Sequence, residues 1–239
     1  MTDKTSEQYW KTELARPAIV AVLGGQPAND PTASWFGRVV VGAKGETWPS
    51  YRGQPLAPIC QINLTECRDR PAPLDGIALL AAFVTPDFAY IEDFHAEEPM
   101  ESEGIGWCVR SYASLDDLVP LTAPELDRCP RPFPISFGKA VDDYPTHDLL
   151  PDDMPENLKD RYYELGWEQN RVNTKLGGWP SCCQSEPCWD YAPGMQGFEF
   201  AWQIASEPKA QWSWGDGGVV CFGRHKTQRN RWAFDWQCF

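Results

Sequence analysis

The sequence has 239 residues, which is enough for one large hydrophobic core or for two fused subdomains of ordinary size. Its formal net charge of −13 argues against nucleic acid or an anionic membrane surface as a direct partner, because both require a basic footprint. No stretch approaches the roughly 20 apolar residues that span a bilayer, and residues 1–16 lack the apolar core of a signal peptide. We therefore expect a cytoplasmic protein whose complement is a basic protein.

Few helices are expected, because 22 prolines and 19 glycines leave little room for long regular ones. Residues 6–14 are a weak helix candidate, and residues 155–165 are a clearer one, with Asp153 as a possible cap and Gly166 as the end. The buried face of the second helix is predicted to carry Leu158, Tyr162 and Leu165.

Strands are predicted from apolar runs and from alternation with a period of two. The apolar residues 76–84 predict a buried strand, and residues 198–204 alternate between apolar and other side chains. The apolar face of the latter would carry Phe198, Phe200, Trp202 and Ile204, and residues 232–238 repeat the alternation. Asp216 precedes a glycine, which suits a tight hairpin between two strands. The fold class expected is α+β, mainly antiparallel sheet.

An internal repeat is indicated by three landmarks that recur in the same order. The pattern Leu-Gly-Gly-x-Pro occurs at residues 23–27 and again at 176–180. Gln61 precedes a glycine by 15 positions, and Gln203 does the same, with an offset of 142 between the copies. The offset of the glycine pattern is 153, which requires an insertion of about eleven residues in the first half. We expect a duplicated chain, with residues 1–140 as the first half and residues 141–239 as a linking helix and the second half, packed as one globular unit.

The net charge is concentrated in two windows that contain no lysine or arginine. Residues 84–109 hold seven acids and residues 141–158 hold six, so the remainder of the chain is neutral. Such windows are typical either of solvated loops or of a binding face. The acids proposed for a binding face are Glu92, Asp93, Glu97, Glu98, Glu101, Glu103, Asp142, Asp143, Asp148, Asp152 and Asp153.

No metal or cofactor is expected. The nine cysteines are an odd number in a chain without an export signal, so most are expected to be reduced and buried. Cys182, Cys183 and Cys188 cluster, but they lack the ligand spacing of a zinc site.

No catalytic centre is expected either, because the three histidines lie in no recognisable motif and no hydrolase, nucleotide-binding or metalloprotease signature is present. An alternative is a cleft between the halves that binds a small molecule or peptide, whether as a binding module or as an enzyme. Its candidate residues are Gln61, Gln184, Gln203, Asp216 and Trp179. Buried glutamines that tie loops together, a turn aspartate and a core tryptophan are the competing interpretations of the same residues.

The second half resembles a known family. Residues 175–180 (KLGGWP), 202–204 (WQI), 214–218 (WGDGG) and 236–239 (WQCF) are similar to motifs of the YwqG-like family, a bacterial family of unknown function. The resemblance covers the last 65 residues well and the first half loosely. It implies an α+β fold with internal duplication. It also implies a genomic setting beside toxin and secretion-system genes, where small acidic cytoplasmic proteins commonly serve as immunity proteins.

These observations favour an immunity-type protein that neutralises a basic toxin or effector, plausibly a nuclease, by docking its acidic segments on the effector's substrate surface. The cleft described above is the alternative, and a scaffold without an inhibitory role is the third hypothesis.

Overall fold

The computed structural model describes residues 3–26, 28–86, 106–126, 128–165, 169–191 and 194–238. Within these ranges the α-helices are α1 (Asp3–Glu13), α2 (Glu156–Glu164) and α3 (Cys188–Tyr191), and short 3-10 helices include η1 (Leu64–Glu66), η2 (Ala72–Leu74), η4 (His147–Leu149) and η5 (Pro208–Ala210). The first-half strands are β1 (Arg16–Leu23), β2 (Trp35–Phe36), β3 (Val41–Ala43), β4 (Ser50–Tyr51), β5 (Gln54–Pro55), β6 (Ala57–Asn63), β7 (Leu79–Val84), β8 (Trp107–Tyr112), β9 (Leu118–Pro120) and β10 (Phe133–Phe137). The remaining strands are β11 (Val141–Asp143), β12 (Lys175–Gly177), β13 (Phe198–Ala205), β14 (Val219–His225) and β15 (Trp232–Gln237).

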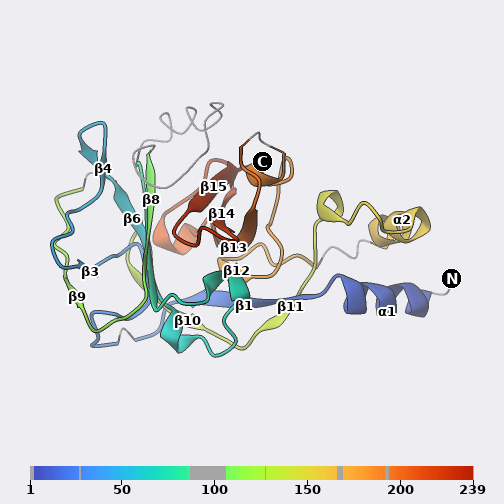
Figure 1. The fold of residues 1–239 in the computed structure, drawn as a ribbon, viewed down its shortest axis with the longest axis horizontal. Coiled ribbons are helices and arrows are strands. Elements are labelled where there is room, and N and C mark those ends of the chain that lie inside the picture. Colours follow the sequence, from blue (N-terminus) through green and yellow to red (C-terminus); the bar gives the residue numbers. More distant parts are fainter. Residues whose placement is uncertain are drawn as a thin grey trace.

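One large sheet dominates the molecule (Figure 1), and its strand order is β15-β14-β13-β12-β1-β10-β2-β6-β7-β8, with β11 also paired to β1. Every pairing between the described strands is antiparallel. The predicted class, a mainly antiparallel fold with few helices, is therefore confirmed. On either side of the central β1–β10 pair, four strands follow one another in chain order, β12 to β15 on one side and β2, β6, β7 and β8 on the other.

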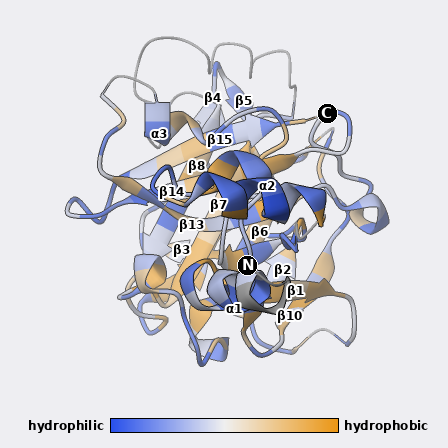
Figure 2. Ribbon diagram, turned by 90° about the vertical axis from the view of Figure 1, so that its right-hand side faces the viewer, coloured by the Kyte–Doolittle hydropathy of each residue, from blue (hydrophilic) through white to orange (hydrophobic). Residues whose placement is uncertain are grey.

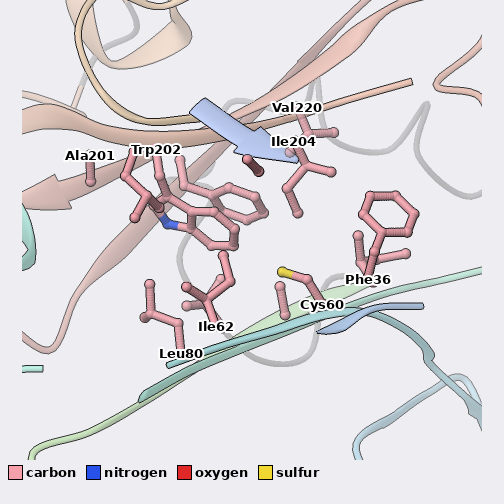
Figure 3. Close-up of a cluster of buried hydrophobic side chains, with 14 of the residues drawn as sticks. Phe36, Cys60, Ile62, Leu80, Ala201, Trp202, Ile204 and Val220 are labelled. Atoms are coloured by element: carbon pink, nitrogen blue, oxygen red, sulfur yellow. The ribbon is translucent and has the colours of Figure 1, made fainter. Parts of the chain in front are cut away.

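The sheet curls until its two edge strands meet, which makes a nearly closed barrel. Trp107 of edge strand β8 stacks on Phe234 of edge strand β15, with ring centroids 5.2 Å apart and planes at 17°. The interior is apolar. Figure 3 shows Ile62 and Leu80 of the first half facing Trp202 across this core. Burial of this shared core holds the two sides of the barrel together.

Several predicted elements are confirmed, since β7 is entirely buried and β15 alternates between two clusters, with Trp232 and Phe234 in the barrel core and Ala233 on the opposite face. The predicted single apolar face of β13 is wrong. A β-bulge lies between Phe200 and Trp202, so Phe198 and Phe200 pack in a separate cluster on the outer face while Trp202 and Ile204 enter the barrel. One extra residue reverses the side on which the following side chains lie.

The predicted tight hairpin at Asp216 is also wrong. Strands β13 and β14 do pair, Ala205 opposite Val219, but residues 206–218 connect them through η5 and a final glycine-rich turn. In the helix at α2, Leu158 and Tyr162 are buried as predicted. Leu165 is exposed, and Asp153 is not the cap, because Pro155 occupies the N-cap position without a side-chain hydrogen bond.

Candidate protein-binding face

A small helical unit presents the second acidic window. Helices α1 and α2 lie side by side at one end of the molecule, beyond the sheet (Figure 1), and they share a hydrophobic cluster with Tyr144 and Leu150, which flank η4. Trp10 of α1 meets Tyr162 of α2 edge to face, with ring centroids 5.3 Å apart. The Tyr162 hydroxyl donates to the carbonyl oxygen of Pro145 at 2.8 Å. This packing fixes η4 and α2 in place, so their exposed side chains form a defined surface.

The exposed surface of η4, α2 and their flanks is rich in carboxylates. We call it the acidic face, and its exposed acids are Asp142, Asp148, Asp152, Asp153, Glu156, Asp160 and Glu164. Within residues 141–165 only Lys159 and Arg161 are basic, so seven exposed acids against two bases leave five negative charges. Lys159 donates to a backbone oxygen and Arg161 lies 3.5 Å from Glu164. The ribbon of α2 is accordingly mostly hydrophilic in Figure 2.

Two large apolar side chains stand among these carboxylates. Tyr163 is 69% exposed and Leu165 is 44% exposed, both at the C-terminal end of α2. The ring of His147 in η4 lies against Tyr163, with centroids 5.2 Å apart. Aromatic side chains surrounded by polar groups are typical anchors of protein interfaces. Sequence analysis did not single out Tyr163 and placed Leu165 on the buried face of the helix. The 100° step from the buried Tyr162 to Tyr163 is the signal that could have indicated its exposure.

Asp143 was predicted to belong to the binding face, and this prediction is wrong. Its side chain is 0% exposed, and it pairs with the equally buried Lys175, with 2.8 Å between Oδ2 and Nζ. Its carboxylate also accepts hydrogen bonds from the backbone N–H of Arg171 at 2.6 Å and of Trp179 at 2.7 Å. Burial lowers the pKa of Lys175, and the charge of Asp143 opposes that shift. Asp143 therefore anchors the acidic segment to the sheet and offers no charge to a partner.

Trp179 is also internal, which contradicts a role in lining a groove. Its indole N–H donates to the carbonyl oxygen of Leu14 at 2.7 Å, and the guanidinium of Arg16 lies 3.3 Å from the ring centroid. Gly178, which precedes it, has a φ of +76°, and a Cβ there would overlap the carboxylate of Asp143. This glycine turn thus joins the end of α1 to the buried ion pair.

Gln61 does not face a cleft. It is fully buried in β6, and its amide donates to the carbonyl oxygens of Pro31 and Ala33, both at 2.9 Å. Its oxygen accepts the backbone N–H of Val40 at 3.1 Å. The side chain holds the loop between β1 and β3 against the sheet and has no free hydrogen-bonding group for a ligand.

Gln203 makes the corresponding contacts from β13. Its amide donates to the carbonyl oxygens of Arg171 and Asn173 and to Ser181 Oγ, and its oxygen accepts the backbone N–H of Ser181 at 2.9 Å. Gln184 and Asp216 are exposed. The structure therefore does not bring the five predicted cleft residues together into one cleft, and the apolar core of Figure 3 fills the space between the halves.

The acids of the first acidic window lie outside the described residues. These acids are Glu92, Asp93, Glu97, Glu98, Glu101 and Glu103.

All nine cysteines are free thiols, and five of them are buried. Burial raises the pKa of Cys182, Cys183 and Cys188, which keeps their thiols protonated. The described residues contain no group of three or more His, Cys, Asp or Glu side chains placed to hold a metal ion. Among the described helices, none is both long and apolar enough to cross a membrane.

One protein family matches most of the chain. Its description is "Domain of unknown function (DUF1963)", and the match covers residues 37–238. The chain belongs to the DUF1963 family. The match contains every strand of the sheet except β1 and β2, together with η4 and α2 of the acidic face. No curated protein matches this DUF1963 sequence, so the family assigns a fold unit without an activity.

Proposed function

We propose that this DUF1963 protein binds a basic protein through the acidic face, and that it acts as a cytoplasmic immunity-type inhibitor of a toxin or secretion-system effector. The observation that carries the proposal is the set of exposed carboxylates, six of them between Asp148 and Glu164 on a helical unit that is stabilised by its own core and one, Asp142, on the preceding strand β11. Facing charges of opposite sign accelerate encounter and discriminate against wrong partners. Tyr163 and Leu165 supply apolar area at the same place. No reactive group is required for such a role.

The kind of partner follows from charge and from the resemblance to YwqG-like proteins. A nuclease or another effector that acts on a polyanion needs a basic substrate surface, and the acidic face would occupy that surface. The acids of the first window, Glu97 and Glu98 among them, would strengthen the field if they lie on the same side. A cleft that uses Gln61 and Gln203 has less support, because both amides are satisfied internally.

We also infer that the two halves are copies of one unit. The backbone partners of Gln203 lie 140 or 141 positions after those of Gln61. A hydroxyl clasp recurs as well, since Ser34 Oγ accepts the N–H of Asn63 and Thr174 Oγ1 accepts the N–H of Ala205. The matching strand order on the two sides of the β1–β10 pair agrees with this duplication.

The geometry changes the alignment of the repeat. Gly177 ends β12 with a φ of +67°, and the glycine in the same place after β2 is Gly37, with a φ of +71°. Gly24 instead follows β1, whose counterpart across the sheet centre is β10. The counterpart of the second Leu-Gly-Gly pattern is therefore at residues 36–38, and no insertion of eleven residues is needed. In this arrangement β10 is the leading strand of the second half, which therefore begins before residue 141. The leading strand of each half then pairs with the other half, β1 with β12 and β10 with β2.

The test is co-purification with the product of the neighbouring gene. A variant in which Asp148, Asp152, Asp153 and Glu156 are changed to lysine should lose the partner, because the face changes from negative to positive. A control variant with the same charge change uses exposed acids elsewhere, namely Asp69, Asp116, Asp117 and Glu125. It should retain the partner. Equal retention by both variants would contradict the proposal.

A further inference from the structure

A pocket opens beside the acidic face. It has a volume of about 250 Å³ and lies between the start of η4, the loop that follows α2 and the end of the β13–β14 connection. Its lining includes Thr146, Asn170, Val172, Ser181, Cys182 and Val219. Thr146 immediately precedes η4, whose Asp148 belongs to the acidic face, so the pocket adjoins that face.

The polar wall of the pocket can accept hydrogen bonds. Thr146 Oγ1 is buried, and it makes no hydrogen bond to any residue that the structure describes. Asn170 donates from its amide nitrogen to the carbonyl oxygens of Tyr144 and Pro180, and its oxygen accepts a hydrogen bond from Ser181 Oγ and keeps one lone pair. A buried hydroxyl without a partner is costly unless a ligand or solvent supplies one.

The pocket lining also contains two valines. Val172 is 65% exposed, and Val219 is buried. A flexible aliphatic stem could therefore lie along the valines while its polar head reaches Thr146 and Asn170. Lysine and arginine side chains combine an apolar stem and a cationic head in this way.

The electrostatic field in the pocket favours a cation. After burial, the nearby carboxylates of Asp235, Asp190 and Asp148 raise the pKa of the Cys182 thiol, so negative charge lies close to this part of the lining. The Lys175 ammonium behind Ser181 is neutralised by Asp143 and does not offset that field.

We propose that this pocket seats one arginine side chain of the basic partner, and that this arginine is the anchor of the interface. The inference rests on the proposed function and names the contact that would hold the complex once charge has steered it together. Arginine fits better than lysine, because its planar head presents several donors to separate acceptors and is more weakly hydrated. The pocket would then determine the lifetime of the complex, and the acidic face its rate of formation.

The experiment uses the full ¹⁵N-labelled chain and the probe L-argininamide. We expect saturable shifts of the backbone amides of Thr146, Asn170 and Val172, and no such shifts with citrullinamide, its uncharged counterpart. Thr146→Val should weaken the binding of argininamide several-fold without lowering stability, because the hydroxyl that it removes makes no hydrogen bond to the described residues. Equal shifts with both probes, or shifts confined to other parts of the surface, would overturn the inference.

A blocking variant separates the pocket from the proposed function. Val172→Trp should abolish the shifts and raise the dissociation rate of the partner complex about tenfold, as loss of an anchor does. Val119→Trp, at another exposed valine, should change neither. If the four-lysine variant weakens the partner complex while Val172→Trp does not, the pocket inference fails and the proposed function stands. If no basic partner binds while argininamide still titrates the pocket, the function fails and the site stands.

Discussion

Replacing Asp143 by asparagine should destabilise the protein more than any other single change to an acid of residues 141–158. The carboxylate and its partner Lys175 are both 0% exposed, and three hydrogen bonds of 2.6 to 2.8 Å converge on it. Asparagine keeps one acceptor oxygen but leaves the Lys175 charge buried without a counter-charge. Removal of one member of a buried ion pair costs about 3–5 kcal/mol. That is a large fraction of the roughly 5–15 kcal/mol that stabilise a typical domain.

Urea unfolding followed by tryptophan fluorescence measures this loss, since the chain contains 12 tryptophans. With a slope of about 2–3 kcal/mol per molar urea, the midpoint should fall by about 1–2 M. Asp142→Asn is the matched control, because its neighbouring carboxylate is exposed, and it should leave the midpoint nearly unchanged. Lys175→Met combined with Asp143→Asn should lose less than Asp143→Asn alone, because no buried charge then remains.

The pH dependence gives the same prediction a second readout. Burial lowers the pKa of Lys175 below its ordinary value of 10.5, and Asp143 limits that shift. Without Asp143 the folded-state pKa falls further, so below pH 10.5 the unfolded chain binds more protons than the folded chain. The Asp143→Asn variant should therefore regain stability as the pH rises toward 10.5, more steeply than the natural sequence. An unchanged midpoint, or a loss independent of pH, would refute the argument.

Three further predictions concern the same scaffold and use the same unfolding assay. Gln61→Leu and Gln203→Leu should each lower the free energy of unfolding by about 2–4 kcal/mol, and by similar amounts, because each leaves several buried backbone groups without partners. Widely different losses would contradict equivalent roles of the two glutamines. Gly178→Ala should cost well over the roughly 1–2 kcal/mol expected from positive φ alone, whereas Gly25→Ala, where a Cβ meets open space, should stay within it. Arg224→Met should cost about 2–3 kcal/mol, because the carbonyl oxygens of Arg229 and Asp75 lose a donor and that of Pro73 keeps only its bond from Arg229; a neutral result would contradict the role of Arg224 in joining the halves.

The fold was predictable where burial is local. The strand at β7 and the alternation of β15 follow from side-chain patterns, because each face of these strands meets one environment. The bulge after Phe200 was not predictable from the sequence, because it depends on the register between β13 and β14. The pairing of β1 with β12 was also beyond the sequence pattern, because it joins strands more than 150 positions apart through packing of the whole barrel.

Some residues of the candidate site could likewise be predicted from the sequence, and others could not. Exposure of Asp148, Asp152 and Asp153 was predictable, because carboxylates in a window without bases stay in water unless a partner is buried with them. The predicted exposure of Asp143 was wrong because this carboxylate is buried together with a partner. That partner, Lys175, lies 32 positions away and reaches Asp143 only in the folded chain. The pocket at Thr146 gave no signal in the sequence, because its lining residues come from four separate segments.

The most direct test of the central claim is the association rate constant of the chain with its purified basic partner, measured as a function of salt concentration. If the acidic face steers binding, the rate should fall steeply as salt rises, and the four-lysine variant of η4 and α2 should be slow at low salt and nearly insensitive to it. A rate that is independent of salt, or one that the variant leaves unchanged, would contradict the account.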